Sequence, residues 1–160
     1  MRYFFLCFFF IVSNARGQQL TLTDLRAITD MQVQEIDRFL ISRGYTLSQN
    51  DSSYISISRY YTSVNKKDSL SIIRSLSWTK AAVNNYEGVL VLYRTYDEKE
   101  QAGFVEFIKS NEYKLSESFR TAESEEFIYS KGDITIRNII TVHRARNGRQ
   151  VRSFAIETGK

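Results

Sequence analysis

The apolar residues of this chain of 160 residues change their spacing at Gly44. Between residues 21 and 43 they recur at helical intervals, which predicts one helix with a single buried stripe. The stripe consists of Leu25, Ile28, Ile36, Phe39 and Leu40. Thr21 with Asp24 three positions on predicts a capping box at the helix start, and Gly44 suits a left-handed cap at its end. Beyond Gly44 the apolar period becomes two, so the helix is expected to pack against strands.

Three strands are predicted in the following segment. Residues 54–61 alternate around Ile55 and Ile57. Residues 69–78 place serines on one face and apolar side chains on the other, namely Leu70, Ile72, Leu76 and Trp78. Residues 89–96 are apolar on both faces, which predicts a strand in the centre of a sheet.

A second helix and four more strands are predicted after that. The helix spans residues 98–111, and the strands span residues 113–120, 126–130, 134–143 and 151–157. Asn147 and Gly148 turn the chain between the last two strands. A two-residue turn would pair Val142 with Ser153, whereas a three-residue loop with left-handed Gly148 places Phe154 on the face of Val142. The three-residue loop is preferred, because one face of this hairpin must be buried.

A short stretch of sequence occurs twice. Residues 39–48 (FLISRGYTLS) align with residues 107–116 (FIKSNEYKLS), and both lie where a helix ends and strands begin. Coincidence is the alternative, since many offsets can be tried, but the shared context favours duplication. The predicted fold class is therefore α+β, with tandem helix-plus-antiparallel-sheet units at residues 18–97 and 98–160 in one compact body.

This order of elements resembles the tandem helix-plus-sheet layout of the bacterial beta-lactamase inhibitor proteins and of small outer-membrane assembly lipoproteins. The resemblance covers most of the chain beyond residue 17, but only as an order of elements, and no motif residue is matched. It implies a fold and transfers no functional residue, because a shared fold does not fix a function.

Residues 1–17 have the three parts of a cleavable secretory signal peptide. Arg2 precedes an uncharged apolar run over residues 3–12, and Ala15-Arg16-Gly17 is a small-x-small ending that predicts cleavage before Gln18. The run is about half the roughly 20 residues that cross a bilayer, so no transmembrane anchor is expected in the mature chain. The alternative is a buried N-terminal strand or helix of a cytosolic fold, which suits the dense aromatic run poorly. We therefore expect an exported bacterial envelope protein, in the periplasm or outside the cell.

Cleavage changes the composition. Removing 17 of 160 residues leaves 143, which suits one compact domain. The sole cysteine, Cys7, leaves with the signal, so neither a disulfide nor thiolate chemistry is expected. Arg2 and Arg16 leave as well, so 20 basic residues face 18 acidic ones and the net charge falls from +4 to +2. So small a charge does not support nucleic-acid binding, which also suits an exported chain poorly.

No catalytic, cofactor-binding or metal-binding residue is predicted. His143 is the only histidine, which excludes a histidine cluster, and it is expected to be an ordinary strand-end residue. The seven glycines form no phosphate-binding loop. Acidic residues cluster at Asp97, Glu98 and Glu100 and again at positions 123–126, where paired carboxylates could serve hydrolysis or calcium binding. A helix N-terminus explains the first cluster and the second lacks a calcium-loop spacing, so solvated surface is preferred for both.

Positive charge gathers around the last predicted turn. Four arginines define what we call the arginine patch: Arg144, Arg146, Arg149 and Arg152. Such a patch predicts contact with an anionic envelope component, for example a lipid head group, or with an acidic protein face. The preferred alternative is that these charges only keep the hairpin edge from pairing with other chains, or face the acidic residues at 123–126.

Tyrosine and serine are dense in the first predicted sheet. They define a candidate binding face: Tyr54, Ser56, Ser58, Tyr60, Ser71 and Ser75. Tyrosine and serine form adaptable protein-binding surfaces at low entropic cost, although an ordinary solvated sheet surface is the competing interpretation. Trp78 is assigned to the core, because it alternates in step with apolar neighbours.

These observations favour a non-enzymatic binding or interaction module of the envelope. One alternative is an inhibitor or immunity-type protein that blocks an exported enzyme. Another is a hydrolase built on carboxylates in a cleft, which needs a converging pair of acidic side chains. The expected partner is another envelope protein or an anionic envelope component, and no cofactor is expected.

Overall fold

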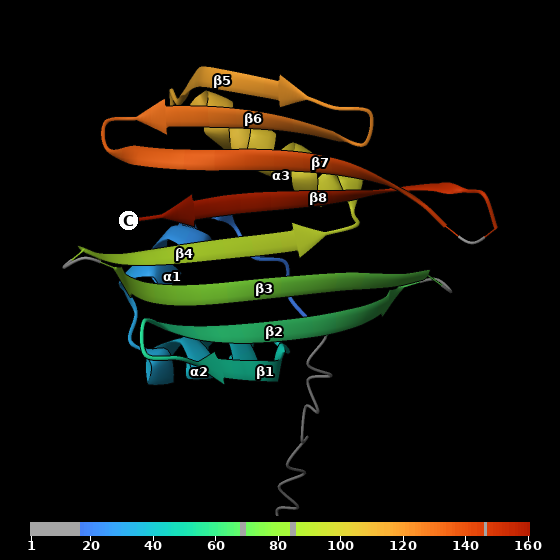
Figure 1. The fold of residues 1–160 in the computed structure, drawn as a ribbon. Coiled ribbons are helices and arrows are strands. Elements are labelled where there is room, and N and C mark those ends of the chain that lie inside the picture. The colour runs from blue at the N-terminus through green and yellow to red at the C-terminus, as the bar shows by residue number, and fades with distance from the viewer. Residues whose placement is uncertain (1–16, 68–69, 84–85, 146) are drawn as a thin grey trace, which may run out of the picture.

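The computed structural model describes residues 17–67, 70–83, 86–145 and 147–160. These residues form three helices and one antiparallel sheet of eight strands (Figure 1), so the predicted α+β class is confirmed. The signal-peptide prediction falls, except for Gly17, outside the described residues. The helices are α1 (Leu22–Asp30), α2 (Val33–Ser42) and α3 (Glu98–Ser110). The strands are β1 (Thr46–Ser52), β2 (Ser56–Lys67), β3 (Leu70–Val83), β4 (Tyr86–Thr95), β5 (Lys114–Arg120), β6 (Ser124–Lys131), β7 (Ile134–Arg144) and β8 (Gln150–Gly159).

β4 and β8 lie side by side in the middle of the sheet, whose order is β1-β2-β3-β4-β8-β7-β6-β5. The chain builds β1 to β4 from one edge inward, crosses by α3 to the other edge, and returns to the centre with β8. Figure 1 shows α1, α2 and α3 behind the same face of the sheet. One core fills the space between the helices and that face, and it includes Tyr61, Tyr93 and Ile156. We call the opposite face, which no described helix crosses, the uncovered face.

The single helix predicted over residues 21–43 is wrong, because two helices stand there. Met31 leaves α1 in an extended conformation, and Gln32 starts α2, where its N–H donates to the Glu35 carboxylate at 2.9 Å. The predicted capping box between Thr21 and Asp24 is present. The apolar stripe continues through the break, so periodicity does not reveal it. The break serves packing, because α1 contacts the central strands β4 and β8 whereas α2 contacts the edge strand β1.

The seven predicted strands are confirmed in their order and differ at their ends, whereas β1 was not predicted. β2 begins at Ser56, so Ile55 lies in the turn before it and is more than half exposed. In β3, Leu76 and Trp78 are buried while the alternating serines face the other way, as predicted. β4 lies in the middle of the sheet, as its apolar sequence predicts.

The β7–β8 hairpin has the predicted three-residue loop. Ala145 donates its N–H to the carbonyl oxygen of Arg149 at 2.8 Å, and Gly148 between them has a left-handed φ of 79°. The resulting register pairs Ile140 with Phe154, which is buried. The argument that one face of the hairpin must be buried therefore predicted the register that the structure has.

The two halves of the chain share local details. α2 is followed by Gly44 with a φ of 79°, and α3 by Glu112 with a φ of 61°. The next strand in each half has a bulge, at Ser48 in β1 and at Ser116 in β5. Each bulge serine donates its hydroxyl hydrogen to a carbonyl oxygen of the neighbouring strand, at 2.9 Å and 3.0 Å.

Candidate functional site

The uncovered face brings together most of the predicted Tyr/Ser binding residues. Tyr61 and Ser63 of β2 are buried on the helix side, so the alternate β2 residues point to the uncovered face. Leu76 and Trp78 fix the orientation of β3 in the same way. The predicted residues on this face are Ser56, Ser58, Tyr60, Ser71 and Ser75. Tyr54 is separate, since it lies fully exposed in the turn between β1 and β2.

A shallow depression of about 330 Å³ lies on this half of the uncovered face. Its polar side chains include Tyr60 and Ser75, and β4 contributes Leu92 and Arg94. Arg94 pairs across the ladder with Ser75 and is exposed. Neither Leu92 nor Arg94 was among the predicted binding residues. The sequence pattern that could have pointed to these positions is the apolar character of both faces of β4, but we interpreted that pattern as a sign of burial on both faces.

Apolar side chains are also exposed on the uncovered face. Val64 is 58% exposed, Ile73 47% and Leu90 44%. They flank the hydroxyl-rich positions and come from β2, β3 and β4. Val64 and Ile73 pair across the β2–β3 ladder and so lie next to each other. Contiguous exposed apolar side chains can mark a protein-contact surface.

Arg137 occupies the other half of the uncovered face. Its Nε lies 2.8 Å from a carboxylate oxygen of Glu126, and its Nη1 lies 2.5 Å from Glu157. These two hydrogen bonds raise the pKa of Arg137 above its ordinary value. Glu126 and Glu157 therefore converge on a cation that holds both of them in ion pairs.

The arginine patch lies apart from the candidate binding face. Arg144 ends β7, Arg149 lies in the loop and Arg152 stands in β8, all three exposed, while Arg146 lies outside the described residues. Arg152 pairs with Val142 and lines a small depression beside the acidic residues 123 and 125. The hairpin extends beyond the neighbouring strands (Figure 1).

His143 contacts Ser153 on the uncovered side of the same hairpin. Its Nε2 lies 2.8 Å from the Ser153 hydroxyl oxygen, and Ser153 is 3% exposed. A serine nucleophile has to be reached by its substrate, and this one is buried within a strand. Among the described residues, no group of three or more His, Cys, Asp or Glu side chains could hold a metal ion.

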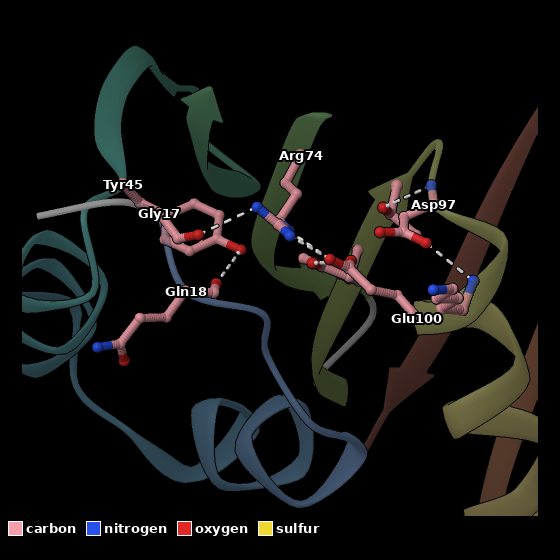
Figure 2. Close-up of polar contacts among 9 residues, drawn as sticks. Gly17, Gln18, Tyr45, Arg74, Asp97 and Glu100 are labelled. Carbon is pink, nitrogen blue, oxygen red and sulfur yellow. Dashed lines mark hydrogen bonds and ion pairs between the residues drawn. The ribbon is translucent and has the colours of Figure 1, made fainter. Parts of the chain in front are cut away.

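The prediction that the first acidic cluster is solvated surface is wrong for Glu100. The Glu100 side chain is 3% exposed and forms an ion pair with Arg74, which is 5% exposed (Figure 2). Arg74 stands in the apolar stripe of β3, where a buried guanidinium requires a counter-charge. Asp97 behaves as predicted, because it caps α3 and accepts a hydrogen bond from the N–H of Lys99 at 2.8 Å. Sequence reasoning missed the pair, although an arginine in step with buried residues was the available signal.

Several elements meet at this ion pair. The hydroxyl of Tyr93 donates to the second carboxylate oxygen of Glu100 at 3.0 Å. Burial, together with the neighbouring Tyr45 and Glu100, raises the pKa of the Tyr93 hydroxyl. Arg74 also donates from Nη1 to the carbonyl oxygen of Gly17 at 3.0 Å (Figure 2). The arrangement satisfies each charge internally, so we assign it to stability rather than to chemistry.

Trp78 lies in the core, as predicted, at 2% exposure. It also lines a cleft of about 680 Å³ where α1 gives way to α2, together with Met31, Ile57 and Val89. Two exposed ion pairs, Lys80–Glu87 and Lys160–Asp30, flank this cleft.

The comparisons with known proteins give no relative: no family model, no curated protein and no solved structure matches the chain. Nothing in them supports an enzymatic activity, and the resemblance in element order carries no functional assignment. Over the described ranges, none of the three helices combines the length and apolarity that a membrane span requires.

Proposed function

We propose that this protein is an exported envelope module that binds a partner protein with the uncovered face of its sheet. The observation that carries the proposal is the packing of α1, α2 and α3 on one side of the sheet, so that no helix of the described residues covers the other side (Figure 1). A sheet in an α+β protein is ordinarily covered by helices or faces water with polar side chains. This face instead combines tyrosine, serine and exposed aliphatic residues.

The composition of the face favours a protein over a small molecule. Tyr60 and the serines of β2 and β3 offer hydrogen-bonding groups with few rotamers to immobilise. Ile73 and Leu90 add apolar area, and Arg94 adds a cation near the middle. The depression between them is shallow, whereas small-molecule sites bury most of their ligand.

Site-specific photo-crosslinking in the native envelope tests the proposal. Benzoylphenylalanine replaces Ser75 or Leu92 on the uncovered face, and Glu106 on the exposed side of α3 is the matched control. We expect one discrete protein adduct from positions 75 and 92 and none from position 106. Equal adducts at all three positions, or none at any, would contradict the proposal.

The identity of the adduct separates two forms of this function. An inhibitor or immunity-type protein forms a stable stoichiometric complex with one exported enzyme. An assembly or scaffold module yields an adduct with a protein that has no catalytic activity. Mass spectrometry of the adduct distinguishes the two forms.

The arginine patch supports a separate contact with an anionic envelope component. Arg144 and Arg149 are exposed at the end of the protruding β7–β8 hairpin, away from the candidate binding face. Arginine suits phosphate groups, since its planar fork makes paired hydrogen bonds. Replacing Arg144, Arg146 and Arg149 with glutamine should abolish retention on anionic liposomes, and unchanged retention would refute this contact.

Export to the periplasm or beyond the cell is proposed from residues 1–17. It is supported by the basic start, the uncharged apolar run and the small residues that follow. Recovery of the protein with Met1 still attached would refute export.

Duplication of a helix-and-four-strand unit is proposed for residues 18–97 and 98–160. It is supported by the order α2-β1-β2-β3-β4, which α3-β5-β6-β7-β8 repeats while α1 is extra in the first half, by the matching sequence segments and by the paired bulges at Ser48 and Ser116. It is further supported by the sheet order, because each edge leads to the centre through four strands in chain order, β1 to β4 from one edge and β5 to β8 from the other.

A further inference from the structure

We infer that export processing cuts the chain between Ala15 and Arg16 and leaves Gly17 in the mature protein, an inference that rests on the proposed export. Two small-x-small endings stand in the sequence, Ser13-x-Ala15 and Ala15-x-Gly17. Sequence alone favoured the second, with a cut before Gln18. The contacts of Gly17 favour the first.

Gly17 is part of the folded body. It is buried, and its carbonyl oxygen accepts a hydrogen bond of 3.0 Å from Nη1 of Arg74. A Cβ at position 17 would lie 2.5 Å from the side chain of Ser63, so the backbone approaches β2 as only a glycine allows. Figure 2 shows the Gly17 carbonyl turned toward the guanidinium of Arg74.

The residues that follow continue this attachment. The N–H of Gln18 donates to the carbonyl oxygen of Arg43 at 2.8 Å, and the Gln18 carbonyl accepts from the hydroxyl of Tyr45 at 3.0 Å. Leu20 is completely buried. The segment from residue 17 onward therefore closes the core beside the ion pair of Arg74 and Glu100.

A cut before Gln18 would damage this region in two ways. It would remove the carbonyl that accepts from Arg74, and a buried donor without an acceptor is costly. It would also turn the Gln18 nitrogen into an ammonium within roughly 5 Å of the Arg74 guanidinium, given ordinary peptide bond lengths. Like charges at this distance repel each other.

A cut after Ala15 avoids both costs. A cellular signal peptidase adds water across the Ala15–Arg16 amide, which leaves a carboxylate on Ala15 and an ammonium on Arg16. Gly17 then keeps both its amide and its carbonyl. The new charge stands two residues before Gln18.

Intact-mass analysis of the exported protein tests the inference, and the variant Ser13→Tyr sharpens it. Ser13 belongs only to the first ending, so this variant blocks the inferred cut and spares the alternative. We expect a mature chain that begins at Arg16, and accumulation of the precursor in Ser13→Tyr. A mature chain that begins at Gln18, unaffected by Ser13→Tyr, overturns the inference but leaves export standing. A chain that retains Met1 overturns both.

A stability measurement provides an independent readout. Purified chains that begin at Arg16 and at Gln18 are compared by thermal unfolding. We expect a clearly lower midpoint for the chain that begins at Gln18. Equal midpoints would show that the Gly17 carbonyl is dispensable and would remove the basis of the inference.

Discussion

The buried ion pair between Arg74 and Glu100 provides the sharpest test of the structure. Glu100→Gln keeps the shape of the side chain and removes its negative charge. The carboxylate accepts hydrogen bonds from Nε and Nη2 of Arg74 and from the hydroxyl of Tyr93. Both charged side chains are about 95% buried. The substitution therefore leaves a guanidinium in the core without its counter-charge.

The expected loss of unfolding free energy is about 3–5 kcal/mol. Removing one partner of a buried pair costs about this much, because the remaining charge is desolvated and unpaired. With an m-value of about 2 kcal/mol/M, the urea midpoint should fall by roughly 1.5–2.5 M. A domain of this size has a total stability of about 5–15 kcal/mol, so the variant stays folded or becomes marginal.

Equilibrium urea unfolding followed by the fluorescence of the single tryptophan and by circular dichroism provides the measurement. The matched control is Glu87→Gln, since the Lys80–Glu87 pair has a similar separation of 2.7 Å but side chains that are 44% and 67% exposed. The control should lose less than about 1 kcal/mol. If the two variants lose the same small amount, the Arg74–Glu100 pair is not desolvated and the reasoning is refuted.

Three further predictions follow from single side chains. Burial raises the pKa of Tyr93, so the folded state keeps a proton that the unfolded state loses above about pH 10. The unfolding free energy should therefore fall above this pH by about 1.4 kcal/mol per pH unit for this tyrosine. Tyr93→Phe should flatten the slope of unfolding free energy against pH, measured by urea unfolding at alkaline pH. Ser48→Ala and Ser116→Ala should each lower the unfolding free energy by roughly 0.5–1.5 kcal/mol, because each removes the hydroxyl hydrogen bond at its bulge; an unchanged urea midpoint in either variant would refute this contribution. Trp78 should emit at short wavelength and resist acrylamide quenching, and a quencher-accessible emission would show that it is not in the core.

Local periodicity predicted most of the elements but not their arrangement. The alternation around Trp78 identified the buried face of β3, and the hairpin argument identified the register that pairs Ile140 with Phe154. The pairing of β4 with β8 was not predicted, because the two strands are far apart in sequence and no local rule relates them. The break at Met31 was missed for a similar reason, since its cause is the packing of α1 and α2 on different strands.

The candidate binding face was predicted in part. Serine positions in β2 and β3 follow from alternation alone, so five of the six predicted residues share the uncovered face. Arg94 was missed because its place at the middle of the uncovered face depends on β4 lying between β3 and β8. Glu100 was misplaced because charge at a helix N-terminus has a sufficient local explanation, and only the fold reveals that it faces Arg74.

The buried ion pair and the uncovered face are two sides of the same strands. Along β4, Tyr93 points into the core and contacts Glu100, while its neighbours Leu92 and Arg94 point to the uncovered face. Along β3, Arg74 points into the core and Ser75 points outward. The hydrogen bonds of the core therefore fix the backbone that presents the candidate binding residues. The proposed binding surface is therefore ordered in the free protein, which would reduce the conformational entropy lost if a partner binds there.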